Sequence, residues 1–165
     1  MDVAGVLGWL HDLPLSETIR TNDFLFPAIE SAHVIASALV VGTVAIVDLR
    51  LLGLTSNKKP VSELSTEVLP WTWLSFVIAV ISGTLMFISK GPVYFANTPF
   101  RLKMLFMVLA GVNMLAFEFL TFRSVHRWDR DVPTLNAAKV AGVLSLVFWI
   151  LVTAFARWIG FTIQG

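Results

Sequence analysis

The chain has 165 residues, of which 56% are hydrophobic and only 14% are charged. Soluble domains carry about 25% charged residues, so this composition favours a membrane protein over a water-soluble domain, as does the mean hydropathy of +0.79. A net charge of +1 without a Lys/Arg stripe excludes a nucleic-acid partner, and the lack of cysteine excludes disulfides, Cys-ligated metals and c-type haem. We expect a single membrane domain over residues 1–165.

The N-terminal residues predict a short helix at the membrane surface. Apolar residues recur at helical spacing from Val3 to Leu13, with Trp9 beside them as an anchor at headgroup level. Pro14 is expected to end this helix. The segment 1–12 lacks the basic region of a signal peptide, so we expect none.

Four stretches are apolar over the roughly 20 residues that a membrane-spanning helix needs. They cover about residues 26–47, 68–88, 104–122 and 140–161. The connections are short and polar, so successive helices should be antiparallel neighbours. The fold class we expect is all-α: an integral membrane four-helix bundle with a short N-terminal interfacial helix. Pro70 is expected in the first turn of the second span, and Gly91-Pro92 at its end.

The distribution of Lys and Arg around the spans predicts the topology. One side holds seven of them, namely Arg50, Lys58, Lys59, Arg123, Arg127, Arg130 and Lys139. The other side holds five, namely Arg20, Lys90, Arg101, Lys103 and Arg157. The first side is therefore expected to be cytoplasmic, which places both termini on the periplasmic side of a bacterial inner membrane.

Ionisable side chains inside a span are costly, so each is a candidate site. Helix direction divides them into two groups. One group should lie near the termini, and comprises Glu30, His33, Lys103 and Arg157, with Tyr94, Asn97 and Arg101 above them. The other should lie toward the opposite face, and comprises Asp48, Arg50 and Glu118. The basic residues of the first group predict a pocket for an anionic group, either haem propionates or a carboxylate substrate.

His33 admits three interpretations. A neutral imidazole inside a bundle is a suitable axial ligand for haem iron; it also serves as a structural hydrogen-bonding group or in proton transfer. Glu30 and His33 form the Glu-x-x-His pair of di-iron bundles, but that chemistry needs a second pair and further glutamates. We expect Arg157 and Glu30 to form an ion pair. Met107 and Met114 are either sulfur ligands or packing residues.

Several motifs along the chain resemble an uncharacterised bacterial family of small four-span membrane proteins, a domain of unknown function. They are Pro-Ala-Ile-Glu-Ser-Ala-His at 27–33, Gly-Thr-Val-Ala-Ile-Val-Asp-Leu-Arg-Leu-Leu-Gly at 42–53, Leu-Pro-Trp at 69–71, Phe-Arg-Leu-Lys at 100–103 and Arg-Trp-Ile at 157–159. The layout is also similar to haem-dependent protoporphyrinogen oxidase and to the copper-resistance D membrane domain. The former resemblance implies a histidine in the first span and a lysine opening a later one, which His33 and Lys103 match.

The leading functional hypothesis is a protein that binds b-type haem for electron transfer or an accessory redox role. His33 would ligate the iron, Lys103, Arg101 and Arg157 would hold propionates, and Glu30 and Asn113 would complete the site. One alternative is a small transporter for an anionic or metal solute. Another is a structural subunit without a cofactor. The expected partners are the lipid bilayer and either a membrane redox partner or further copies of the chain.

Overall fold

The computed structural model describes residues 2–55, 60–122, 125 and 135–163. The described residues form helices and no strands, which confirms the expected all-α class. The elements are α1 (Val3–His11), α2 (Pro14–Thr21), α3 (Leu25–Leu51), α4 (Val61–Ala96), α5 (Thr98–Ala116), the π-helix η1 (Phe117–Thr121) and α6 (Asn136–Ile163).

Four helical stretches are long and apolar enough to cross a bilayer, and they correspond to the four predicted spans: α3, α4, Thr98–Leu120 and α6. Large apolar side chains near the middle of each span point outward. Ile35, Ile81, Val108 and Ile150 are between 57% and 63% exposed. A surface of this kind is unfavourable in water and suits the hydrocarbon core of a bilayer. The architecture is that of an integral membrane protein.

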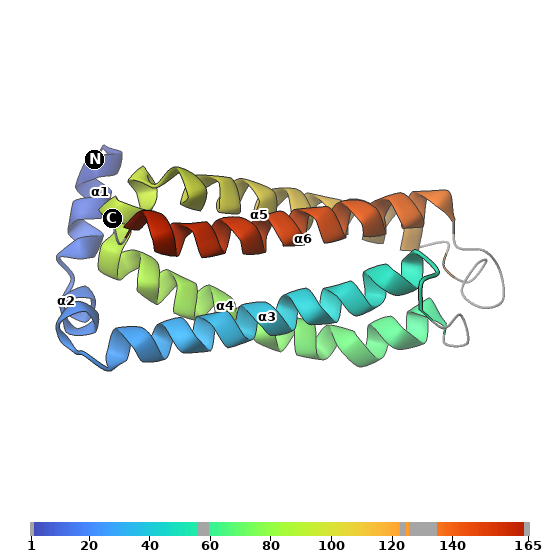
Figure 1. Cartoon of the computed structure of the whole chain (residues 1–165), viewed down its shortest axis with the longest axis horizontal. Helices are drawn as coiled ribbons and strands as arrows, with labels where there is room; N and C mark the ends of the chain where they lie inside the picture. Colours follow the sequence, from blue (N-terminus) through green and yellow to red (C-terminus); the bar gives the residue numbers. More distant parts are fainter. Residues whose placement is uncertain (1, 56–59, 123–124, 126–134, 164–165) are drawn as a thin grey trace.

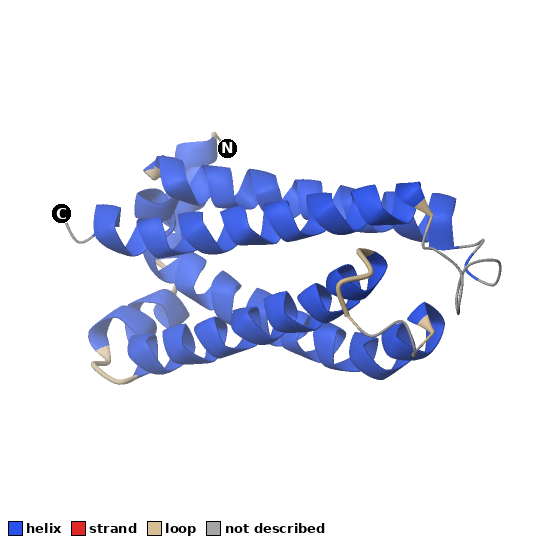
Figure 2. Cartoon of the chain, turned by 45° about the vertical axis from the view of Figure 1, so that its right-hand side comes forward, coloured by secondary structure: helices blue, strands red, loops and turns tan. Residues whose placement is uncertain are grey.

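The four long helices are arranged as two antiparallel pairs (Figures 1 and 2). α3 packs along α4, and α5 packs along α6, while α3 and α6 join the two pairs. α1 and α2 lie across one end of the bundle, where the chain's two termini also lie (Figure 1). We call this the terminal end. The opposite end, where α3 ends and α6 begins, is called the loop end. That both termini share one end agrees with the prediction, whereas five of the seven basic residues used to orient the chain (Lys58, Lys59, Arg123, Arg127 and Arg130) lie outside the described residues.

Pro14 is the first residue of a second short helix, α2. The sequence predicted a single surface helix up to Leu13, but α1 ends at His11 and α2 starts at Pro14. Proline suits the first turn of a helix because its missing N–H would have no partner there. α2 is amphipathic and buries Ser16 and Ile19 completely against the bundle.

α4 is longer than the predicted second span at both ends. It starts at Val61, so Pro70 lies inside the helix and not in its first turn, and it continues past Gly91-Pro92 to Ala96. Gly91-Pro92 was predicted to close this span, and the helix does break immediately before this pair, although a further helical segment continues to Ala96. Lys90 has non-helical backbone angles, φ −137° and ψ 33°, so two helical segments meet there across a kink.

The side chains of α2 stabilise that kink. Pro92 has no N–H, so the carbonyl of Ile88, four residues earlier, loses its donor within the helix. The Ser16 hydroxyl donates to this carbonyl at 3.0 Å. Arg20 Nη1 donates to the next carbonyl, that of Ser89, at 3.4 Å, and to the Ser16 hydroxyl at 3.0 Å. Backbone groups without partners are costly away from water, so these bonds let α4 bend without ending.

The two helix pairs meet closely at Gly142, near the loop end. A Cβ on Gly142 would lie 3.3 Å from the Asp48 carbonyl oxygen and 3.4 Å from Leu51 Cβ. Beside this contact lies a buried apolar cluster of Leu51, Val61, Val125 and Ala138, with Val47, Phe117 and Phe122 packed against it. Glycine at 142 therefore allows α6 to approach the backbone of α3.

Substituting Gly142 with alanine is expected to destabilise the bundle by about 1–3 kcal/mol, because the added methyl group would press on the α3 backbone. Gly160→Ala is the matched control on the same helix, since a Cβ there has nothing within 4 Å. Thermal unfolding in detergent, followed by circular dichroism, measures both. Equal stability of the two variants would contradict a tight α3–α6 contact.

Candidate functional site

His33 lies in the contact between α3 and α4, and its ring has a defined orientation. Nδ1 is 3.0 Å from the Ala79 carbonyl oxygen and 3.1 Å from the Ser82 hydroxyl. A carbonyl oxygen only accepts, so Nδ1 must carry the proton and donate it. Nε2 is then the unprotonated nitrogen, with its lone pair available. This is the tautomer that a metal-ligating histidine has when a backbone carbonyl holds its other nitrogen.

Gly83 provides the space for this imidazole. A Cβ on Gly83 would lie 2.9 Å from His33 Cε1 and 3.3 Å from Nδ1, closer than packed carbon atoms approach one another. The ring therefore lies directly on the backbone of α4. Ser82, the preceding residue, is buried and donates its own hydroxyl to the Ile78 carbonyl at 2.6 Å. The His33 ring thus packs on Gly83 and hydrogen-bonds to Ala79 and Ser82, all of them residues of α4.

Small residues on one face of α4 permit close helix packing. Ser75, Ser82 and Ser89 recur every seven residues and are all buried. A seven-residue interval keeps side chains on one face of a helix that packs along a neighbour. The sequence did not, however, connect this face with His33. A glycine in the middle of an apolar helix is unfavourable and usually has a packing reason, so Gly83 was the available signal.

Lys103 is the one predicted basic residue that the structure brings near His33. It projects from α5 and is only partly exposed, and its charge lies close enough to act on the His33 imidazole. Glu30 interacts electrostatically with Tyr94, a buried residue near the end of α4. Glu30 itself is exposed and lines a shallow surface hollow with Ser31, Val34 and Ile35.

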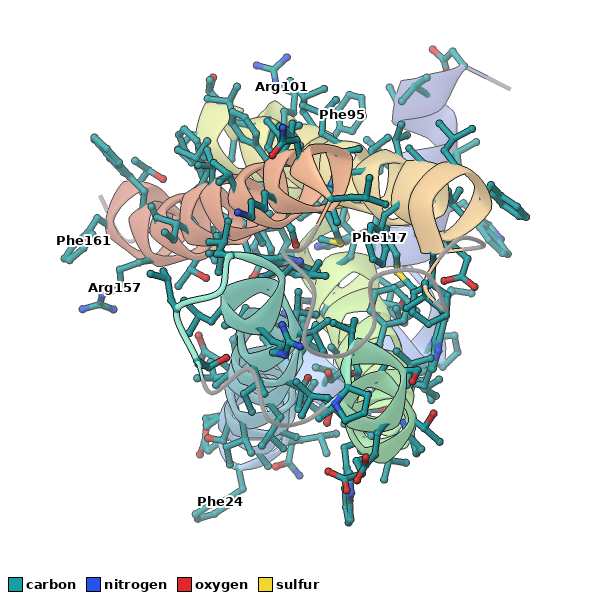
Figure 3. The ribbon with its side chains drawn as sticks, turned by 90° about the vertical axis from the view of Figure 1, so that its right-hand side faces the viewer. Phe24, Phe95, Arg101, Phe117, Arg157 and Phe161 are labelled. Atoms are coloured by element: carbon teal, nitrogen blue, oxygen red, sulfur yellow. The ribbon has the colours of Figure 1, made fainter. Side chains whose placement is uncertain are left out.

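Arg101 and Arg157 point away from the bundle, in different directions (Figure 3). Arg101 is exposed and donates to the Thr98 hydroxyl on its own helix at 3.3 Å. Arg157 is exposed and its guanidinium lies 4.7 Å from the centre of the Phe161 ring. Among the described side chains Arg157 forms no ion pair with Glu30, contrary to the prediction. Helix direction placed these arginines at the right depth but could not give their orientation.

Two further predicted site residues lie elsewhere. Asn113 Nδ2 donates to the Ala141 carbonyl at 2.9 Å, which joins α5 to α6 beside the Gly142 contact. Asn113 lies ten residues after Lys103, or about 15 Å along the helix, so it belongs to the loop end. Met114 is 46% exposed and faces outward. Within α5 only Ala110 is buried.

The fold defines a small helical membrane protein with four spans and a histidine held between the first two. The chain belongs to a family of unknown function (DUF6644), whose model matches residues 21–162. No curated protein matches the chain, and no solved structure does.

Proposed function

We propose that the chain is a membrane protein that binds b-type haem, with His33 Nε2 as an axial ligand of the iron. The orientation of the imidazole is the observation that carries this proposal. Donation from Nδ1 to the Ala79 carbonyl leaves Nε2 unprotonated, and neutral imidazole nitrogen is the usual axial ligand of haem iron. The bond to Ala79 also supplies the outer support that ligating histidines almost always have.

The set of donor groups fits haem better than an ion bound by protein ligands alone. In the part of the chain that the structure describes, no three His, Cys, Asp or Glu side chains come together. A structural or catalytic zinc site needs three or four protein ligands. Porphyrin supplies four nitrogens itself, so one or two axial ligands suffice, and His33 meets that requirement.

Lys103 is the residue we assign to a propionate. It comes from α5, across from His33 on α3, and its charge lies within range of the imidazole. An ammonium group that is shielded from water is stabilised by an opposite charge, which a propionate would supply. Arg101 and Arg157 point outward and are not assigned this role, so the proposed site is smaller than the sequence predicted. Asn113 is likewise left out.

The role that follows is electron transfer or an accessory redox function. When bound, the haem supplies a one-electron couple, while the chain supplies burial, ligation and orientation. The layout resemblance to haem-dependent protoporphyrinogen oxidase remains a resemblance of the sequence. Placement in a bacterial inner membrane with periplasmic termini also remains a prediction, drawn from the Lys/Arg distribution.

The visible spectrum of the protein tests the proposal. Purified in detergent from haem-replete cells, the protein is expected to show a Soret band and α/β bands on reduction, and His33→Ala is expected to lose them. His11→Ala is the control, because His11 is an exposed surface histidine that contacts Asp12. A colourless protein that also fails to bind added haemin would refute the proposal, and so would a His33→Ala variant with an unchanged spectrum.

The same experiment separates haem binding from a purely structural histidine. The bonds of His33 to Ala79 and Ser82 connect α3 to α4. If that is their whole purpose, His33→Ala lowers the unfolding temperature and changes no spectrum. The transporter hypothesis is not carried forward, because two of the three basic side chains on which it depended point out of the bundle.

A further inference from the structure

Asp48 is a buried carboxyl group at the loop end, far from His33. It lies fifteen residues further along α3, which is about 22 Å. The side chain is 5% exposed. The Ser145 hydroxyl of α6 hydrogen-bonds the carboxyl group, but Oδ2 is buried and has no hydrogen-bond partner. This atom is the one buried polar side-chain atom without a partner among the described residues.

Apolar residues cover Asp48 on the side nearest to the loops. Leu51 is three residues beyond Asp48 on α3, about 4.5 Å closer to the loop end, and Ala138 is four residues before Gly142 on α6, about 6 Å closer. Both belong to the buried apolar cluster, in which Val61 and Ala138 are fully buried. Gly142 brings the α6 backbone against the Asp48 backbone. Among the described residues, the loop-end side of this carboxyl is therefore lined by apolar side chains and by the α6 backbone.

Five charged groups lie at the loop end on the described parts of the elements around Asp48. They are Arg50 on α3, Glu63 and Glu67 on α4, Glu118 on η1 and Lys139 on α6. The three glutamates are exposed and Lys139 is half-buried. Arg50 is buried and has an interaction of its own. None of these groups is a hydrogen-bond partner of Oδ2.

A carboxylate in this position would leave a negative charge in an apolar environment, with one oxygen unsolvated. Burying an isolated ionised carboxylate is so unfavourable that such a group takes up a proton instead. Burying the neutral carboxylic acid costs less free energy than burying the carboxylate, because it carries no net charge and one of its oxygens hydrogen-bonds with the Ser145 hydroxyl. An ionisable group kept inside a span is a candidate for a functional role.

We propose that Asp48, with Ser145 as its partner, is a proton-binding site of the membrane bundle that holds a proton at neutral pH. The ligand is the proton itself, exchanged between the Asp48 carboxyl and whatever donor or acceptor reaches the α3–α6 contact. The site is independent of the proposed haem site, because it lies at the other end of α3 and shares no described contact with His33.

Reaction with an apolar carbodiimide tests this proposal. Dicyclohexylcarbodiimide reacts with a protonated carboxyl: the acid proton moves to a carbodiimide nitrogen, the carboxyl oxygen adds to the central carbon, and rearrangement leaves a stable N-acylurea. The full chain in lipid vesicles at neutral pH is treated, digested and mapped by mass spectrometry. We expect Asp48 to be labelled by this reagent and not by a water-soluble carbodiimide.

Glu63 is the matched control carboxyl, since it lies in the first turn of α4 at the same end of the bundle and is exposed. It is expected to react with the water-soluble reagent and not with the apolar one. Asp48→Asn should fold with unchanged or higher stability, because the neutral amide has the shape of the neutral acid. Absence of label at Asp48, together with a less stable Asp48→Asn variant, would overturn the proposal in favour of a charged carboxylate with a partner.

Infrared difference spectroscopy decides the matter if the reagent does not reach the site. A protonated carboxyl has a C=O stretching band apart from the carboxylate bands, and this band should be lost in Asp48→Asn and shift to higher wavenumber in Ser145→Ala. Its absence from the parent protein would overturn the proposal. Protection of Asp48 from carbodiimide labelling by sodium ions but not by potassium ions would also overturn it, because the site would then bind a metal cation in place of a proton. Neither measurement depends on haem.

Discussion

Gly83→Ala is expected to weaken haem binding by about 10- to 100-fold, the loss typical when the outer support of a ligating histidine is removed. The added Cβ would lie 2.9 Å from His33 Cε1, so the ring must move away from α4. Movement breaks the 3.0 Å bond from Nδ1 to the Ala79 carbonyl and turns Nε2 away from its ligating position. Titration of the apoprotein with haemin, followed at the Soret band, measures the change.

Gly42→Ala is the matched control for this substitution. Gly42 lies on α3, the helix of His33, and a Cβ there meets nothing within 4 Å. Its haemin affinity should equal that of the parent. Should Gly83→Ala retain full affinity while its stability falls, the imidazole would be a packing residue and the haem proposal would lose its main support.

Loss of the bonds from α2 to the α4 kink is expected to have the second large effect. Ser16→Ala and Arg20→Ala should each destabilise the protein by about 1–3 kcal/mol, the usual cost of leaving a buried polar group unsatisfied. Ser16 is fully buried and supplies the hydroxyl that donates to the Ile88 carbonyl. Arg20 binds the Ser89 carbonyl and also the His11 carbonyl at the end of α1. Unfolding in detergent measures these changes.

Two further variants test whether Ser16 acts by satisfying the carbonyl that Pro92 leaves without a donor. Thr18→Ala on α2 is the control, because Thr18 is exposed and donates only to Pro14 within its own helix. Pro92→Ala restores an N–H for the Ile88 carbonyl, so the cost of Ser16→Ala should be smaller in that background. A double-mutant cycle measures the coupling. Independent, additive effects of the two substitutions would show that Ser16 does not act by satisfying the kink.

Much of the fold followed from residue type and spacing. Four apolar stretches of about 20 residues predict four spans, because a bilayer allows few other structures for such a sequence. The ends of α4 were not evident. Hydropathy detects only the apolar part of a helix. The first turns of α4 contain the charged residues Glu63 and Glu67, so they lie outside the apolar stretch although they are helical.

The candidate site was predicted in part. Helix direction brought His33 and Lys103 to the same end of the bundle, and the structure agrees. Arg101 and Arg157 have the same depth but point outward, and depth along a helix carries no information on how the neighbouring helices are rotated. Asn113 was predicted to complete the site near His33, but it lies about 15 Å along α5 from Lys103 and bonds to Ala141 on α6.

The sequence by itself determined the number of spans, the all-α class and the presence of costly ionisable groups within the spans, because these depend on composition and periodicity along one chain. Only the tertiary structure decided which of those groups acquire partners. Gly83 and the Ala79 carbonyl orient His33, α2 makes the kink at Lys90 tolerable, and Gly142 with the apolar cluster isolates Asp48. Each of these depends on contact between residues far apart in the chain, and such contacts arise from packing that local sequence does not specify.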